Sequence, residues 1–186
     1  VMSGYHGLPA ARVFRHDVVV RLAEASSVPV VNMLSDHSHP LQGLADALTM
    51  LQEFGSLKGR TVAWVGDYNN VARSLGEVCA YLGAHIRFGC PDGYSAPDDD
   101  VQRFLDMGAP SVESSADPMA AVVGAHAVHT DTWVSMGQED EKAERLAIFG
   151  GYTVNESMMA KGASDAIFMH CLPAYRGLEV DASVID

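Results

Sequence analysis

Two side chains near the start of a predicted helix have the chemistry to hold a small carbonyl compound. Residues 35–42 read Ser-Asp-His-Ser-His-Pro-Leu-Gln, and Pro40 suits the first turn of a helix. His39 and Gln42 stand three residues apart, so both can lean to one side of the helix start. An imidazole and a carboxamide offer donors and acceptors to a planar carbonyl or amide, while free N–H groups at the helix start favour an anion. Alternatively, His37 and His39 decorate a loop, or form a metal pair whose third ligand is not at metal spacing nearby.

A polar turn follows the most strand-like segment of the sequence. Residues 66–70, Gly-Asp-Tyr-Asn-Asn, occupy the place of a dinucleotide-binding loop. They lack the Gly-x-Gly-x-x-Gly pattern, so nicotinamide binding loses the glycines that allow close approach of a pyrophosphate. We expect either Asn69 or Asn70 to cap the following helix, and the other to present its amide to a ligand carboxylate.

Two further segments place reactive side chains after predicted strands. Residues 131–137 read Asp-Thr-Trp-Val-Ser-Met-Gly, in which Asp131 either holds a substrate ammonium group or caps a turn. Residues 170–173 read His-Cys-Leu-Pro. The thiol of Cys171 can be a nucleophile, a metal ligand or a buried inert group, and the last is the default for a lone cysteine.

Apolar runs alternate with amphipathic stretches, which is typical of the α/β class. Residues 61–66 are the strongest predicted strand, and residues 41–54 form the clearest helix. Other strands are expected over residues 28–33, 84–88, 111–113, 125–130 and 166–170, and other helices over residues 16–25, 71–82, 99–107, 118–123, 139–148 and 156–161. Such alternation predicts a doubly wound, Rossmann-like parallel sheet covered on both faces. Ligands of these sheets bind beyond the carboxyl ends of the strands, where the polar segments fall.

The composition and net charge indicate which kinds of binding partner are disfavoured. The 186 residues are 48% hydrophobic and 19% charged, which is typical of a globular chain able to bury roughly 70% of its unfolded surface. Twelve basic against 24 acidic residues give a net charge of −12, which disfavours nucleic acid and anionic membrane surfaces. The acidic triplet at 98–100 is expected to be a solvated helix start.

Cysteine usage and hydropathy bear on location. Three cysteines, an odd number without a Cys-x-x-Cys pair, favour reduced thiols and a cytoplasmic protein. No window approaches the 18 apolar residues of a membrane span. The opening residues, Val-Met-Ser-Gly-Tyr, indicate neither a signal peptide nor an ordinary initiator context, and we expect them to lie in the middle of a protein.

Taken together, these segments resemble the carbamoyltransferase family, and within it the ornithine-specific branch. The motifs that carry the resemblance are His-Pro-Leu-Gln at 39–42, Gly-Asp with Asn-Asn at 66–70, Asp-Thr-Trp-Val-Ser-Met-Gly at 131–137 and His-Cys-Leu-Pro at 170–173. They stand in the family's order, with consistent spacing, over essentially the whole chain. The Ser-Met-Gly and His-Cys-Leu-Pro elements point to ornithine, because an aspartate-specific relative is expected to lack both.

The resemblance implies transfer of the carbamoyl group from carbamoyl phosphate to the δ-amine of L-ornithine, giving L-citrulline and phosphate. It implies that the contacts to carbamoyl phosphate are Arg12, His39 and Gln42. It implies that the contacts to the α-amino-acid group of ornithine are Asn70, Asp131, Ser135 and Met136. Cys171 and the carbonyl of Leu172 would lie where the amine attacks. No metal or organic cofactor is implied, and we expect direct attack by the amine without a covalent intermediate.

The same resemblance implies a division of the chain and an assembly. Residues 1–45 would be the C-terminal part of a carbamoyl-phosphate domain with the start of an inter-domain helix, and residues 46–186 the ornithine domain. The partners implied are two small molecules and further copies of the chain, as a homotrimer or a multiple of trimers.

This sequence also departs from the family pattern. The family's Ser-x-Arg-Thr-Arg phosphate loop and its C-terminal Glu-Asn-Arg element do not occur in these residues. Gly7 and Pro9 interrupt the apolar run where relatives place a buried strand before Arg12. We therefore expect the 186 residues alone to bind ornithine weakly and to turn over poorly or not at all.

Three other functions remain open on the sequence. The acceptor could be another amine, such as putrescine or a modified ornithine; only an α-amino acid needs the clamp of Asp131, Ser135 and Met136. The chain could instead be a non-catalytic paralogue or binding domain, an interpretation favoured by the missing phosphate loop. A Rossmann oxidoreductase is third, disfavoured by the absent glycines after Val65.

Overall fold

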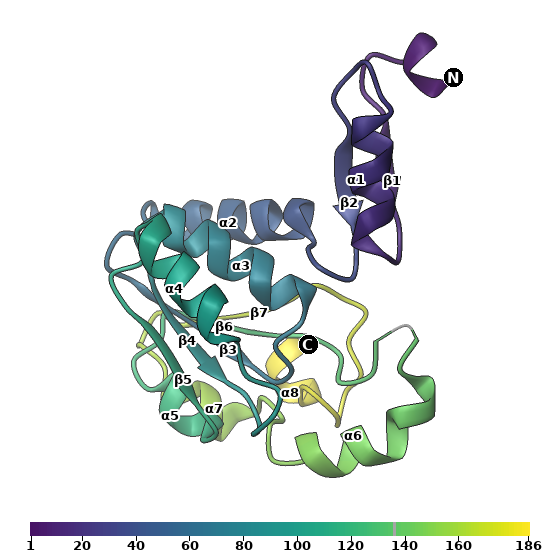
Figure 1. Cartoon of the computed structure of the whole chain (residues 1–186). Coiled ribbons are helices and arrows are strands. Elements are labelled where there is room, and N and C mark those ends of the chain that lie inside the picture. The colour runs from purple at the N-terminus through teal and green to yellow at the C-terminus, as the bar shows by residue number, and fades with distance from the viewer. Residues whose placement is uncertain (136) are drawn as a thin grey trace.

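The alternation of strands and helices produces one parallel sheet with helices on both faces and a smaller β–α–β unit beside it (Figure 1). This is seen in a computed structural model that describes residues 1–135 and 137–186. The sheet has the strand order β5-β4-β3-β6-β7, and all its neighbouring strands pair in parallel. The expected α/β fold is therefore confirmed.

The strands of the main sheet are β3 (Thr61–Val65), β4 (His85–Gly89), β5 (Val112–Ser115), β6 (Ala127–Thr130) and β7 (Ile167–His170). The helices of the larger body are α2 (Pro40–Phe54), α3 (Asn70–Tyr81), α4 (Asp98–Met107), α5 (Pro118–Val122), α6 (Lys142–Phe149), α7 (Glu156–Met159) and α8 (Ala182–Ile185). Short 3-10 turns are η1 (Met2–Gly4) and η2 (Glu139–Glu141). The sequence did not predict α8.

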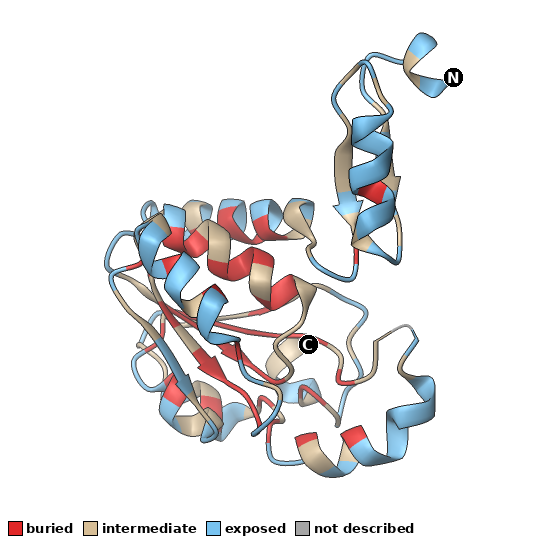
Figure 2. Cartoon of the chain, in the orientation of Figure 1, coloured by how far each residue is buried: buried red, intermediate tan, exposed pale blue. Residues whose placement is uncertain are grey.

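The central strand β3 divides the core in two, because successive side chains of a strand point to opposite faces. Val62 and Trp64 pack with the helices α2, α3 and α4, whereas Ala63 and Val65 pack with α5, α6 and α7. Figure 2 shows this strand and its neighbours as the buried centre of the larger body. Burial on both faces explains why residues 61–65 are continuously apolar apart from Thr61.

Strand register brings the polar segments together. Val65 pairs with Thr130, and Thr130 pairs with His170, so β3, β6 and β7 end side by side. The residues that directly follow these ends are Asp131 and Cys171, with Asp67 one residue beyond Gly66. Three segments that are far apart in the chain thus reach one edge of the sheet, as expected for parallel strands.

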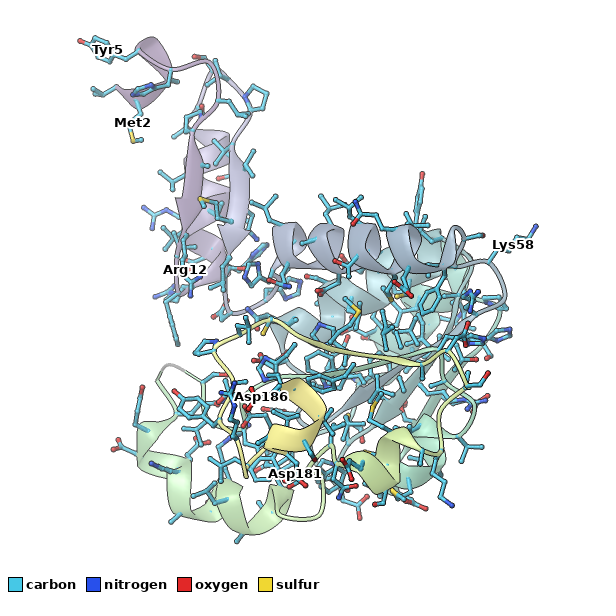
Figure 3. The ribbon with its side chains drawn as sticks, turned by 180° about the vertical axis from the view of Figure 1, so that it is seen from behind. Met2, Tyr5, Arg12, Lys58, Asp181 and Asp186 are labelled. Atoms are coloured by element: carbon cyan, nitrogen blue, oxygen red, sulfur yellow. The ribbon has the colours of Figure 1, made fainter. Side chains whose placement is uncertain are left out.

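The smaller unit consists of β1 (Ala10–Arg12), α1 (His16–Glu24) and β2 (Val31–Leu34), with the two strands parallel. Figure 3 shows Arg12 at the end of this unit that lies nearest the larger body. The strand expected over residues 28–33 begins only at Val31, because Pro29 has no N–H to donate. Gly7 and Pro9 do interrupt the preceding run, and β1 starts directly after Pro9.

One sequence expectation about the surface is wrong. Asp100, the last of the acidic triplet, is only 4% exposed, whereas Asp98 and Asp99 are exposed. Its carboxylate accepts from the Arg73 guanidinium at 2.6 Å and from the Tyr68 hydroxyl at 2.8 Å. These partners lie distant in sequence, so the local charge pattern could not show them. Among the described residues, no helix combines the length and the apolar character needed to cross a membrane.

Candidate active site

A cleft of about 740 Å³ lies where the smaller unit faces the carboxyl ends of the strands. Its walls come from both parts of the chain, since Arg12 and Ser35 lie on one side and the residues after β3, β6 and β7 on the other. The predicted site residues that line it are Arg12, His39, Asn70, Asp131, Ser135, Cys171 and Leu172. Met136 lies outside the described residues.

His39 is fixed at the start of α2. Its backbone N–H donates to the Ser74 hydroxyl at 2.8 Å, which anchors the start of α2 to α3. Burial, followed by the charge of Arg12, lowers the pKa of His39 below its ordinary value. The Nδ1 atom is buried and has no partner among the residues that the structure describes. The imidazole is therefore neutral at neutral pH and has hydrogen-bonding capacity left for a ligand.

The adjacent residues Asn69 and Asn70 make different contacts. Asn69 is the N-cap of α3, and its side-chain oxygen accepts from the N–H groups of Val71 and Ala72, each at 3.0 Å. Its side-chain nitrogen donates to Asp131 at 2.7 Å. Asn70 lines the cleft and donates to the Ser35 carbonyl at 2.7 Å. The expectation that one asparagine caps the helix is thus confirmed.

Asp131 is the central acceptor of the cleft and is 9% exposed. Besides Asn69, the Thr132 N–H at 2.7 Å and the Cys171 thiol at 3.0 Å donate to its carboxylate. A carboxylate offers roughly four acceptor sites, so these three donors leave capacity for one more. An ammonium group of a ligand fits that remaining capacity.

Cys171 is held in its thiol form. Burial, and then the neighbouring Asp131 charge, raise the pKa of Cys171 far above its ordinary value. The thiol donates its proton to Asp131, so the sulfur is not a thiolate nucleophile. This arrangement supports the prediction of direct amine attack without a covalent enzyme intermediate.

His170 fixes the loop that carries Cys171. Its Nδ1 accepts from the Leu172 N–H at 2.8 Å, and its Nε2 lies 3.2 Å from the fully buried Glu179 carboxylate. Ligand atoms of Asp131, His170 and Cys171 lie within 4.8 Å of one another, a spacing that a metal ion can accept. Both imidazole nitrogens are already engaged and the thiol keeps its proton, so metal binding there would have to break these hydrogen bonds.

Arg145 is a cleft residue that the sequence analysis missed. Its guanidinium pairs with Asp67, donates to the Trp133 carbonyl at 2.5 Å, and stands 5.3 Å from the Tyr94 ring centroid. Burial nevertheless raises the pKa of Asp67, against the opposing effect of Arg145. Arg145 belongs to a short helix together with one lysine and one glutamate, and no local pattern distinguishes it from a surface arginine.

Gln42 does not line the cleft. It lies on the first turn of α2, and its side-chain nitrogen donates to the buried Asp46 at 2.8 Å. Arg12 and Ser135 do face the cleft, from β1 and from the loop after β6. The structure thus brings members of both groups of predicted substrate contacts to one cleft, whereas Gln42 is not among its lining residues.

Two family models match the chain in succession. Residues 1–52 match the carbamoyl-P binding domain of aspartate/ornithine carbamoyltransferase, and residues 58–186 match the Asp/Orn binding domain. The chain belongs to the aspartate/ornithine carbamoyltransferase family. The ornithine carbamoyltransferase of Methanocorpusculum labreanum is 43% identical over 186 residues, covering 100% of this chain and 61% of that relative. That of Parasynechococcus marenigrum is 45% identical, covering 100% of this chain and 59% of the relative.

Solved structures agree with these sequence relatives. Ornithine carbamoyltransferase from Pyrococcus furiosus superposes with a TM-score of 0.92 at 43% identity, covering 100% of this chain and 60% of that one. The member of the family from Thermus thermophilus superposes with a TM-score of 0.88 at 40% identity. The chain thus spans about 60% of the length of the relatives it matches.

Proposed function

We propose that the complete protein carrying this chain transfers a carbamoyl group from carbamoyl phosphate to the δ-amine of L-ornithine. The observation that carries the proposal is Asp131, a cleft carboxylate with acceptor capacity for one ammonium group, in a chain whose relatives are ornithine carbamoyltransferases. The α-ammonium group of ornithine supplies that donor. Asn70, Ser135 and Met136 complete the contacts to the amino-acid group in this proposal.

Carbamoyl phosphate binds beside them. Arg12 and His39 face the cleft and offer a guanidinium and a neutral imidazole to the phosphate and carbonyl oxygens. Gln42 accepts a hydrogen bond from the carbamoyl NH₂ in this scheme. Fixed donors of this kind stabilise the oxyanion that develops on the carbonyl oxygen, each by a few kcal/mol.

The chemical step is a direct displacement. The δ-amine must first lose a proton, after which its nitrogen lone pair attacks the carbonyl carbon from about 3–3.5 Å. A C–N bond forms, the C–O bond to phosphate breaks, and the phosphate leaves with the bonding electrons. The nitrogen then loses its second proton, giving L-citrulline and phosphate. Cys171 and Leu172 line the cleft, and in this scheme the thiol and the Leu172 carbonyl lie near the attacking amine.

The organisation of the chain belongs to the same proposal. Residues 1–45 would serve the carbamoyl-phosphate side and residues 46–186 the ornithine side. A cytoplasmic location is supported by three cysteines that are all free. A homotrimeric assembly is implied by the family resemblance, and light scattering on the purified protein tests it.

A citrulline-formation assay, run with the intact mass of the preparation, tests the activity. We expect citrulline from ornithine and carbamoyl phosphate with the complete protein, and little or none at a mass of 19.9 kDa. Putrescine and an Nα-modified ornithine, used as competing acceptors, should be poor substrates, because putrescine lacks the α-carboxylate and the modified ornithine lacks the α-ammonium group. Preference for either would assign a different acceptor, and binding without turnover in the complete protein would favour a non-catalytic paralogue.

A further inference from the structure

A buried polar pair lies behind the cleft and has no part in the proposed chemistry. Asp46 on α2 and His129 on β6 are 3% and 0% exposed. The His129 Nε2 lies 3.2 Å from an oxygen of Asp46. The imidazole stacks on Trp64, with ring centroids 5.1 Å apart and an interplanar angle of 19°. A charged or polar group is costly to bury unless it is well partnered, so the pair calls for an explanation.

Both nitrogens of His129 face oxygen acceptors. The Nδ1 lies 3.0 Å from the Thr130 carbonyl, and the Nε2 faces the Asp46 carboxylate. A carbonyl and a carboxylate can only accept, so each ring nitrogen of His129 lies at hydrogen-bond distance from an acceptor oxygen. His129 on β6 therefore holds one oxygen of Asp46, on α2, in a fixed position against the sheet.

The other oxygen of Asp46 determines which atom of the Gln42 carboxamide faces it. It accepts from the Gln42 Nε2 at 2.8 Å, four residues earlier on the same helix. A carboxylate cannot donate, so the carboxamide must present its nitrogen to Asp46 and leave its oxygen free. Without this selection, the two ends of the carboxamide are of nearly equal shape and could exchange places.

We propose that Asp46 and His129 are positioning residues that fix the carboxamide of Gln42, so that its oxygen accepts from the NH₂ of carbamoyl phosphate. The inference rests on the proposed function for the identity of that ligand. It gives a function to the hydrogen bond between Gln42 and Asp46, and to the buried pair that Asp46 on α2 forms with His129 on β6. Asp46 also influences a residue of the cleft. The pKa of Cys171 is raised first by burial, then by Asp131, and then by the negative charge of Asp46.

A double-mutant cycle between positions 46 and 42, made in the complete protein, tests the coupling. Asp46→Asn keeps the size of the side chain but can donate as well as accept, so the carboxamide loses its single orientation. We expect the variant to lower kcat/KM for carbamoyl phosphate about tenfold, with KM for ornithine within twofold of the parent. In a Gln42→Ala background, the same change should cost less than twofold. Equal losses in both backgrounds would overturn the proposal.

Variants at His129 extend the test. His129→Phe keeps a ring on Trp64 but removes the donor to Asp46, and we expect the same kinetic pattern as Asp46→Asn. His129→Gln keeps a donor and should recover much of the lost activity. The matched control is His85→Gln, at the start of β4, whose imidazole is hydrogen-bonded only to Ser111 among the described residues; this variant should stay within twofold. A His129→Phe protein with parental kinetics would contradict the proposal.

An NMR measurement separates this inference from the proposed function. The side-chain NH₂ signal of Gln42 is identified by its loss in Gln42→Ala, and its hydrogen exchange is measured without any substrate. We expect exchange at least tenfold faster in Asp46→Asn than in the parent. If the complete protein makes no citrulline, the proposed function fails, while unchanged exchange of this NH₂ would overturn the positioning role by itself.

Discussion

In the proposed function, Asp131 is the residue that binds the α-ammonium group of the acceptor. Asp131→Asn removes the negative charge that faces the ligand ammonium but keeps an oxygen for the Thr132 N–H. Loss of a charge-assisted hydrogen bond costs about 2–3 kcal/mol, so kcat/KM for ornithine should fall by roughly 30- to 200-fold. KM for carbamoyl phosphate should change little. Steady-state kinetics with each substrate varied in turn measure both, and a loss confined to carbamoyl phosphate would place Asp131 elsewhere in the mechanism.

Cys171 should be unreactive despite lining the cleft. Burial and Asp131 raise its pKa, so the thiolate fraction at neutral pH is lower than that of a free cysteine. We expect iodoacetamide to label it at pH 8 at least 100-fold more slowly than glutathione. Burial also raises the pKa of Cys90 to about 12, so Cys90 should react equally slowly with iodoacetamide. Unfolded protein serves as the control, and labelling of Cys171 in folded protein at pH 8 as fast as glutathione would show that the thiolate is accessible.

His39 should titrate below its ordinary pKa of 6.5, for two reasons that can be separated. Burial acts first and the Arg12 charge second, and both disfavour the imidazolium. The folded state therefore binds fewer protons than the unfolded state between the lowered value and 6.5, and this residue's contribution to stability rises with pH across that window. An NMR titration measures the midpoint, and Arg12→Gln should move it upward. A midpoint above 6.5 would contradict the neutral imidazole assigned here.

At the scale of elements, the close packing of α2 on α3 sets the position of His39. A Cβ atom at Gly43 would lie 2.9 Å from the Ser74 carbonyl oxygen, next to the hydroxyl that anchors His39. Gly43→Ala gains about 1 kcal/mol of helix propensity but forces the helices apart at a cost of about 1–3 kcal/mol. We expect a lower free energy of unfolding and a raised KM for carbamoyl phosphate. Leu44→Ala, 59% exposed on the same helix, is the control for denaturation and should stay within about 0.5 kcal/mol.

The spacing of apolar residues was sufficient to predict the helices and strands whose buried positions recur at a regular period. The helix at 41–54 and the strand at 61–66 were predicted almost to the residue, because their apolar positions follow the helical and the buried-strand pattern. The prediction was wrong where a partner distant in sequence decides burial, as for Asp100 with Arg73. The motifs identified which segments meet at the cleft, but not Arg145, whose partner Asp67 is 78 residues away.

At the scale of the whole molecule, the two parts of the chain differ in how much apolar surface they bury. Among residues 1–34, all of which the structure describes, Val19 is the one buried residue, and Figure 2 shows the rest of the smaller unit as partly or fully exposed. Its apolar side chains with at least 38% exposure include Phe14, Val18 and Leu22. Hydrophobic burial is the main stabilising term in folding, so this unit should open at a small free-energy cost.

Amide hydrogen exchange on the 186-residue chain would measure this difference directly. We expect the amides of β1, α1 and β2 to exchange with protection factors under about 10², and those of β3 and β6 to approach the protection set by global unfolding, about 10⁴ or more. Because Arg12 sits on the smaller unit, a chain with this pattern would hold the ornithine side of the cleft rigidly and the carbamoyl-phosphate side loosely. Ornithine should then bind measurably by calorimetry, while carbamoyl phosphate should not. Equal protection in both parts would mean that the two fold as one cooperative unit, and that the cleft is preformed on both sides.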